Sequence, residues 1–447
     1  MHTTILSLFA ALTIPLTATD LELTKASDWP GWRGMGADSV SQGSPPLEFD
    51  EESNIKWKAE LPGRGLSSPV IVGKRVFVTS AVPIEDGSAP ADAPAGDGRS
   101  RRDQPPVNEV DFLVMAFDRA DGAIAWEQVA RTQVPHQGTH PDGSFAAPSV
   151  VSDGEHVFVS FGSYGIYAYD LVGELAWEVD LGDMDIHNGF GEGSSPVLCG
   201  DALIVQWDHI GDSFLVALNK ATGKELWRSA RELGTNWSTP LVVPQGEGGP
   251  LIVVASSTTV AYEAATGDVA WTCGPTGSAR PGGIIVSPLM HEGVLIYGTG
   301  TRRGGTMVAV KFDDASGVDV HESDALMWTR DRDVPRIPSP VAHDGILYAL
   351  KSTSGILSAF DVQSGEALYE PTRLEGVSDV WASPIVAADR IYIAGRDGTI
   401  EVVAAGAEFA TLAVNHLDAI FDASPAVAGD ELYLRGRSEL YCIAKEE

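Results

Sequence analysis

Four side chains that could bind a metal lie close together in the sequence: Glu192, Asp208, His209 and Asp212. Their carboxylate oxygens suit a hard cation such as calcium, and the imidazole nitrogen would also admit a transition metal. A hydrogen-bonded polar cluster is the favoured interpretation of these residues, and a metal site is the alternative.

A second set of candidates is scattered along the chain. Its members share one position, a loop just before a small residue and a proline. The set consists of Arg64, His140, His187, Glu192, Asn236, Trp237, Arg280, Arg336, Asp379, Trp381 and Asp422. Ionisable and aromatic side chains that converge on a concave surface are the usual mark of a ligand site. The alternative interpretation is that loops are polar anyway and that some of these charges pair with one another.

The small residue and proline that follow these loops recur eight times. The pairs are Ser68-Pro69, Ala147-Pro148, Ser195-Pro196, Thr239-Pro240, Ser287-Pro288, Ser339-Pro340, Ser383-Pro384 and Ser424-Pro425. Neighbouring pairs are 41 to 52 residues apart, except for one gap of 79 residues. A period of this size indicates a repeat array of similar supersecondary units.

Each repeat is predicted to be a four-stranded antiparallel meander. In the third copy the strands A to D are expected at residues 196–199, 202–207, 214–218 and 225–228, separated by Gly/Asp/Asn turns. A glycine precedes a tryptophan by four residues at the start of strand D, as in Gly223 and Trp227. We expect the glycine to form the turn and the indole to pack against the next sheet.

Eight such sheets predict an all-β, eight-bladed propeller. The eighth copy has strands A to C and then the chain ends, whereas residues 54–61 around Trp57 form a strand with no strand A before it. We therefore expect this N-terminal strand to complete the last blade and close the ring, which also removes exposed sheet edges.

The topology also sorts the loops. The D-to-A and B-to-C connections of a meander emerge on one face of the propeller, and the A-to-B and C-to-D turns emerge on the other. The candidate residues fall on the first face, and D-to-A loops lead into the innermost strands. The scattered candidates are therefore predicted to surround the mouth of the axial channel.

Composition limits the function classes. The formal charge of −32 and the pI of about 4.5 disfavour nucleic acid and anionic lipid as partners. The apolar run at residues 5–18 predicts a signal peptide over 1–19 and a periplasmic or secreted protein, and no segment is long enough to span a membrane. Residues 20–447 form one predicted domain, with a Pro/Gly-rich flexible insertion at 83–109.

Several motifs resemble known propeller repeats. The segments at 221–227 (ATGKELW) and 264–271 (AATGDVAW) resemble the tryptophan-docking repeat of pyrroloquinoline quinone (PQQ)-like propellers. The segments at 29–34 (WPGWRG), 190–196 (FGEGSSP) and 432–437 (LYLRGR) resemble secreted bacterial proteins of the PQQ-binding-like β-propeller repeat family. That family is similar to the outer-membrane assembly lipoprotein BamB and, in blade number, to the quinoprotein alcohol dehydrogenases.

The resemblance implies a fold more than a function. Quinoprotein alcohol dehydrogenases typically carry an adjacent pair of cysteines beside the quinone, whereas Cys199, Cys273 and Cys442 lie in three different repeats. PQQ and calcium are therefore not supported by motif, and none of these cysteines can be the lipidated first residue of a BamB-type mature chain.

The favoured hypothesis is a non-catalytic, monomeric binding or scaffold protein of the cell envelope. Its D-to-A/B-to-C face would hold a small molecule or a segment of a partner protein. The alternatives are a PQQ- and calcium-dependent dehydrogenase and a metal-assisted hydrolase or lyase that acts on an envelope carbohydrate.

Overall fold

The structure is a computed structural model that describes residues 27–84, 108–245, 249–274, 283–301, 304–317, 319–351 and 353–446. The expected signal peptide at 1–19 lies outside these ranges, and so does most of the expected flexible insertion at 83–109. Both therefore stay expectations. Among the described residues, no helix is long and apolar enough to cross a membrane.

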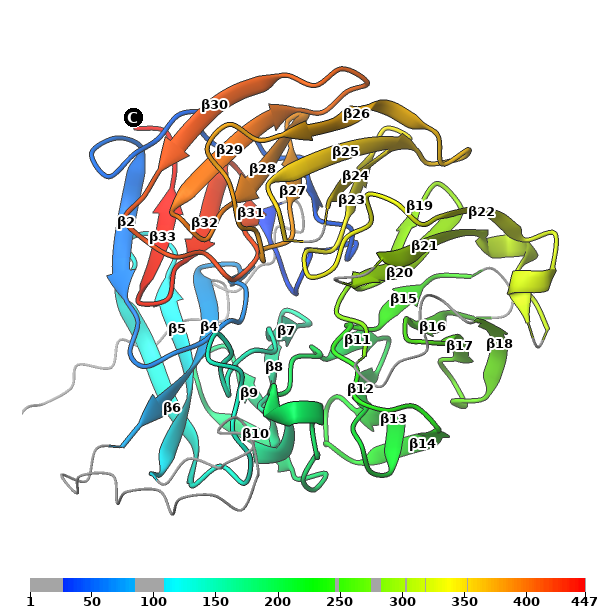
Figure 1. The fold of residues 1–447 in the computed structure, drawn as a ribbon. Helices are drawn as coiled ribbons and strands as arrows, with labels where there is room; N and C mark the ends of the chain where they lie inside the picture. Colours follow the sequence, from blue (N-terminus) through cyan, green and yellow to red (C-terminus); the bar gives the residue numbers. More distant parts are fainter. Residues whose placement is uncertain are drawn as a thin grey trace, which may run out of the picture.

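Eight sheets stand around a common axis, as the ribbon in Figure 1 shows. Each blade contains four antiparallel strands, and the described helices are short 3-10 turns such as η4 (Gly162–Tyr164) and η5 (His187–Gly189). The predicted eight-bladed, all-β propeller is confirmed.

The first four blades follow chain order from the innermost strand outward. Blade one comprises β3 (Val70–Val72), β4 (Arg75–Pro83), β5 (Val110–Asp118) and β6 (Ile124–Gln133). Blade two comprises β7 (Val151–Ser152), β8 (His156–Ser160), β9 (Ile166–Asp170) and β10 (Leu175–Val179). Blade three comprises β11 (Val197–Cys199), β12 (Ala202–Trp207), β13 (Ser213–Asn219) and β14 (Glu225–Arg231). Blade four comprises β15 (Leu241–Val243), β16 (Leu251–Val254), β17 (Thr259–Glu263) and β18 (Val269–Cys273).

The next three blades repeat this order, and blade seven gains an extra strand. Blade five comprises β19 (Leu289–His291), β20 (Val294–Thr301), β21 (Gly304–Lys311) and β22 (Leu326–Arg330). Blade six comprises β23 (Val341–His343), β24 (Ile346–Leu350), β25 (Ile356–Asp361) and β26 (Ala367–Arg373). Blade seven comprises β27 (Ile385–Ala387), β28 (Arg390–Ala394), β29 (Thr399–Ala404), β30 (Thr411–His416) and the added β1 (Val40–Ser41).

Blade eight is built from both ends of the chain. Strands β31 (Ala426–Ala428), β32 (Glu431–Arg435) and β33 (Glu439–Ile443) are completed by β2 (Ile55–Glu60), which pairs antiparallel with β33. Trp57 faces Cys442 in this register, and Figure 1 shows the blue strand β2 beside the red strand β33. The predicted closure by the N-terminal strand is therefore confirmed.

Docking tryptophans join five of the blades to the blade that follows. The indole nitrogens of Trp57, Trp126, Trp177, Trp227 and Trp328 each donate to a backbone carbonyl of the following blade at 2.8–3.0 Å. A glycine of that following blade lies under the ring. At Gly122, which has φ 74°, an added Cβ would be only 2.6 Å from Cε3 of Trp57. These glycines thus supply both the left-handed turn and the room for the indole.

The recurring serines form a closed ring of hydrogen bonds around the axis. In each blade a backbone N–H donates to the hydroxyl of the next blade at 2.8–3.1 Å, and the eighth bond returns to the first residue. The members are Ser68, Ser149, Ser195, Thr239, Ser287, Ser339, Ser383 and Ser424. The small residue is therefore a hydroxyl residue because its oxygen accepts this bond.

The ring corrects the sequence analysis in blade two. Ser149 occupies the ring position there, so Ser149-Val150 is equivalent to Ser68-Pro69. In the other blades the proline directly follows the hydroxyl residue of the ring, whereas Pro148 directly precedes Ser149. Our alignment on Ala147-Pro148 was therefore wrong by two residues.

The axial channel contains a segment that the sequence analysis did not place there. Residues 27–49 contact the innermost strands of several blades: Trp29 pairs with Ile71, and β1 runs parallel to β27. Arg33 is 3 % exposed and donates to the carbonyls of Pro288 (3.4 Å) and Pro340 (2.6 Å) in blades five and six. This segment braces blades that are far apart in the ring.

Candidate functional site

The loops on the D-to-A/B-to-C face bring five of the eleven predicted residues into two neighbouring groups, which we call the charged cluster and the inner hollow. The charged cluster consists of Arg64, Asp142, Asp379, Arg396, Asp422 and Arg437. The inner hollow lies between blades two and three beside Glu192. A row of aromatic rings connects the two groups.

Asp422 and Asp142 hold the charged cluster together. Asp422 accepts from Nε of Arg396 at 2.6 Å and from Nε of Arg437 at 3.0 Å, and its side chain is 2 % exposed. Asp142 accepts from the same two arginines at 2.8 and 3.0 Å. Asp379 adds a third carboxylate to Arg396 at 3.1 Å. Burial opposes these charges, yet the arginine bonds hold the pKa of Asp142 below its ordinary value.

Arg64 enters the same cluster from the loop before blade one. Its Nη1 donates to the carbonyl of Pro141 at 2.5 Å, while Nε and Nη2 are buried without a bonding partner. Burial, together with the nearby positive charge of Arg437, lowers the pKa of this guanidinium. The predicted convergence of Arg64, Asp379 and Asp422 is thus seen, and so is the pairing of loop charges that we named as the alternative.

The aromatic row consists of Trp381, His140, Phe190 and Trp237. Ring centroids are 6.1 Å apart between Trp381 and His140, 5.4 Å between His140 and Phe190, and 6.2 Å between Phe190 and Trp237. Arg396 lies 4.1 Å over the ring of Trp381. The rings are tilted by 42–67° to their neighbours, so the row offers a stepped series of half-buried aromatic rings with a cation at one end, suited to contacts with extended chains.

Glu192 stands between two small hollows, at the other end of this row. Its Oε2 accepts from the backbone N–H of Ser163 at 2.8 Å, and its Oε1 accepts from the Ser163 hydroxyl at 2.5 Å. Burial raises its pKa to about 7, because desolvation outweighs the two bonds from Ser163. This carboxyl group therefore titrates near neutral pH.

The inner hollow on one side of Glu192 contains a side chain that the sequence analysis missed. Gln206, near the end of β12, is 4 % exposed, and neither its amide nitrogen nor its amide oxygen has a bonding partner. The lining also includes Ser160, Ser194, Asp208 and Asn236. A glutamine inside a strand resembles any other polar residue in sequence, so no local pattern marks it.

The other predicted residues have more local roles. The amide of Asn236 is fully used, since it donates to Ser238 and Ala255 and accepts from Ile284. His187 donates its backbone N–H to Thr235 at 3.0 Å. Arg336 is half-buried in its loop, and Arg280 lies outside the described residues.

The candidate metal residues of blade three have protein partners. Both oxygens of Asp208 accept from Arg231, at 2.7 and 3.0 Å, and both side chains are fully buried. Nδ1 of His209 accepts from the backbone of Asp185 at 3.0 Å, and Asp212 is exposed. The favoured interpretation, a hydrogen-bonded polar cluster, describes this geometry. A metal at these residues stays a prediction.

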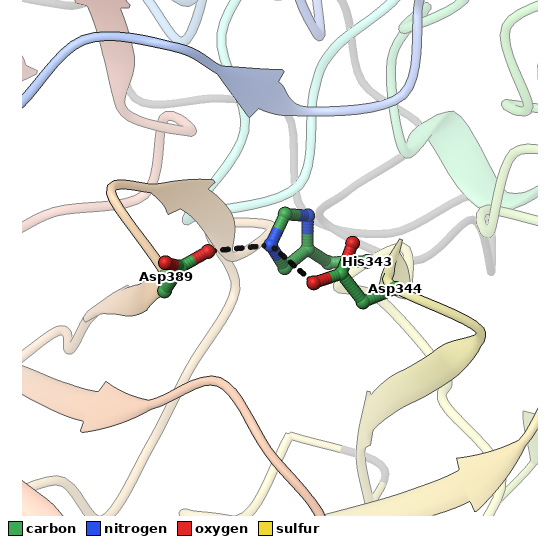
Figure 2. A group of neighbouring side chains, drawn as sticks. All are labelled: His343, Asp344 and Asp389. Carbon is green, nitrogen blue, oxygen red and sulfur yellow. Dashed lines mark hydrogen bonds and ion pairs between the residues drawn. The ribbon is translucent and has the colours of Figure 1, made fainter.

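A different group of ligand-type side chains occurs on the opposite face. In the described part of the chain, His343, Asp344 and Asp389 have ligand atoms within 4.8 Å of one another. Figure 2 shows the ring of His343 between the two carboxylates, with Nε2 at 2.9 Å from Asp389 and 3.6 Å from Asp344. The histidine thereby links the A-to-B turns of blades six and seven, and both carboxylates are largely exposed.

Comparison with known proteins places this fold among quinoprotein-like propellers. The europium-containing methanol dehydrogenase superimposes with a TM-score of 0.61 and 12% identity, over 94% of this chain and 98% of that one. Quinohemoprotein alcohol dehydrogenase from Comamonas testosteroni gives 0.61 and 12%, over 95% and 82% of the two chains. At these identities the similarity shows the fold alone.

BamB proteins are similar in both sequence and structure. BamB from Moraxella catarrhalis superimposes with a TM-score of 0.54 and 15% identity, over 83% of this chain and 98% of that one. The outer membrane protein assembly factor BamB of Yersinia pestis is 25% identical over 293 residues, which cover 64% of this chain and 58% of the relative. The match thus spans less than two thirds of that relative's length.

The family model described as outer membrane protein assembly factor BamB matches residues 48–188 and 211–447, which together contain blades one to eight apart from parts of blade three. The chain therefore belongs to this BamB family of PQQ-like β-propellers.

Proposed function

We propose that this protein is a non-catalytic binding propeller of the cell envelope. Its D-to-A/B-to-C face holds a segment of a partner protein or a small ligand, and the protein acts in the periplasm or after secretion as a monomer. The aromatic row is the observation that carries this proposal.

The chemistry of the face supports a binding role. Four rings lie in succession, and at one end the arginines of the charged cluster are held by fixed ion pairs. Rigid aromatic side chains supply large contact area at a small loss of conformational entropy. The similarity to BamB, whose name describes assembly of outer membrane proteins, favours a protein partner over a small molecule.

The described residues do not fit the quinone that some propellers of this fold contain. The two hollows beside Glu192 each have room for about one water molecule, far less than a three-ring quinone needs. Cys199, Cys273 and Cys442 are free thiols on three separate blades.

Replacing Trp237 and Trp381 with alanine tests the proposed face. The immobilised protein is incubated with an envelope extract of its source cell, and retained proteins are quantified by mass spectrometry. We expect both variants to lose a partner that the unmodified protein retains. Trp126→Ala is the matched control, since it removes a half-buried indole from a blade interface instead. Equal retention by all four proteins would show that the partner binds another surface.

A further inference from the structure

The inner hollow contains polar atoms that the protein itself does not satisfy. Both amide atoms of Gln206 are buried without a partner, although its side chain lines the hollow. Leaving a buried donor and a buried acceptor unpaired costs about 1–3 kcal/mol each. Such a cost is normally offset by an occupant that bonds to these atoms.

The rest of the lining combines apolar side chains, such as Met184 and Ile186, with several oxygen atoms. Ser160 is 4 % exposed and accepts from Gly162 at 3.2 Å, which leaves the second lone pair of its hydroxyl oxygen available as an acceptor. Glu192 accepts only neutral donors, both from Ser163, and among the described residues no ion pair reaches it. The hollow thus presents a carboxylate, an amide oxygen and a hydroxyl oxygen with no cation between them.

The charged and titratable groups around Glu192 leave this carboxylate uncompensated. His136 and Asp183 act on it from outside the hollow, and Tyr164 lies on the far side of the carboxyl group. Asp208 also lines the hollow, but Arg231 neutralises it through two bonds. A positively charged occupant would therefore meet one unpaired negative charge.

Size and access restrict that occupant. The hollow has room for about one water-sized group, which suits a tetrahedral ammonium and is too small for a planar guanidinium. Glu192, Gly193 and Ser194 are only half-buried, so the hollow can be reached from the mouth of the propeller. Trp237, the end of the aromatic row, donates to the carbonyl of Gly191 at 2.7 Å beside this entrance.

We propose that the hollow between Glu192 and Gln206 binds a primary ammonium group, carried by a lysine side chain of the partner segment or by a free small amine. The three N–H groups would donate to the carboxylate of Glu192, the amide oxygen of Gln206 and the hydroxyl oxygen of Ser160, while the chain that carries them lies along the aromatic row. The net charge of −32 favours such a cationic ligand at long range. This inference rests on the proposed function and specifies its ligand chemistry.

Titration calorimetry with defined probes tests the inference. The probes are n-butylammonium chloride, an acetylated and amidated pentapeptide with a central lysine among glycines, and the same peptide with norleucine or acetyl-lysine at the centre. We expect the lysine peptide to bind and both uncharged peptides to bind at least about tenfold more weakly, since hydrogen bonds to a charged group are each worth about 1.5–3 kcal/mol. Comparable binding of the butylammonium probe would identify a free amine as a sufficient ligand.

Variants locate the binding in the hollow. Glu192→Gln keeps the shape of the side chain and removes its charge, and we expect at least about tenfold weaker binding of the lysine peptide. Glu401→Gln is the matched control, because Glu401 is a buried carboxyl group that, like Glu192, accepts from one hydroxyl and from backbone N–H, those of Thr411 and Glu375, but in blade seven. Gln206→Leu removes only unpaired polar atoms, so it should fold at least as stably and still weaken binding.

Two results would overturn the inference. One is equal binding of the lysine and norleucine peptides, and the other is unchanged affinity in both Glu192→Gln and Gln206→Leu while thermal melts show folded protein. Neither result would contradict the proposed function if Trp237→Ala and Trp381→Ala still abolish retention of the partner protein. In that case the partner binds the aromatic row without an ammonium in the hollow.

Discussion

Asp422 is the most buried carboxylate of the charged cluster, with a side chain that is 2 % exposed against 33 % for Asp142 and 43 % for Asp379. Asp422→Asn would deprive Arg396 and Arg437 of the more buried of the two carboxylates that they share, so we expect a loss of about 2 kcal/mol in the free energy of unfolding. Asp379→Asn, which removes one exposed bond, should cost less than about 1 kcal/mol. Urea unfolding of both variants measures the difference, and equal losses would contradict this ranking.

Glu192 gives the stability a pH dependence of unusual sign. Its pKa is raised from 4.5 to about 7 in the folded protein, so the folded state binds more protons than the unfolded state between these values. Its contribution to stability is therefore greatest below pH 4.5 and is lost as the pH rises through 7. We expect Glu192→Gln, which stays neutral, to gain melting temperature relative to the unmodified protein between pH 5 and pH 8. A pH-independent difference between the two melting curves would refute this linkage.

At the residue scale, candidates such as Arg64, Asp379 and Asp422 lie together, but the sequence did not predict what they contact. Asp142 and Arg396 are 254 positions apart, and only the ring geometry brings them to 2.8 Å. Asp208 was considered as a metal ligand because its partner Arg231 gave no local signal. Long-range pairs of this kind depend on loop conformations that no repeat period encodes.

Strands and turns form the next scale, and here Gly122 and Gly200 make a matched pair. Both have positive φ (74° and 59°), but an added Cβ meets Trp57 at 2.6 Å in one case and nothing within 4 Å in the other. We expect Gly200→Ala to cost about 1 kcal/mol, from the backbone alone. Gly122→Ala should cost about 3 kcal/mol because it also displaces the docked indole. Chemical denaturation measures both, and equal costs would mean that the indole moves freely.

The elements were predictable wherever a period or a turn signal marked them. Strand β12 was expected at residues 202–207 and is Ala202–Trp207, since Gly/Asp turns bound it on both sides. Blade two was misaligned because its proline is displaced relative to Ser149. Strand β1 and the buried Arg33 were missed because residues 27–49 follow no repeat and bind through single contacts to several blades.

At the scale of the whole molecule, the ring is closed in three independent ways. Strand β2 pairs with β33, the eight hydroxyl bonds form an unbroken circle, and residues 27–49 tie the innermost strands of opposite blades together. Removal of the segment before Leu61 eliminates two of these three connections, the β2–β33 pairing and the contacts of residues 27–49, although blades one to seven keep all four of their own strands. The ring of hydroxyl bonds must then hold blade eight against blade one together with side-chain contacts such as Arg435 to the carbonyl of Thr79 (2.7 Å) and Arg119 to Glu431 (2.6 Å).

A chain that begins at Leu61 should therefore expose the edge of β33 and associate through it, because an unpaired edge strand is a template for another chain. Sedimentation velocity should show oligomers or aggregates, whereas we expect a chain that begins at Ser27 to sediment as a monomer. Adding a peptide of residues 27–60 in trans should restore the monomer-sized species by reforming the β2–β33 ladder. If the Leu61 chain were monomeric and had the melting temperature of the control, the N-terminal segment would occupy its place in blade eight without contributing to the stability of the closed ring.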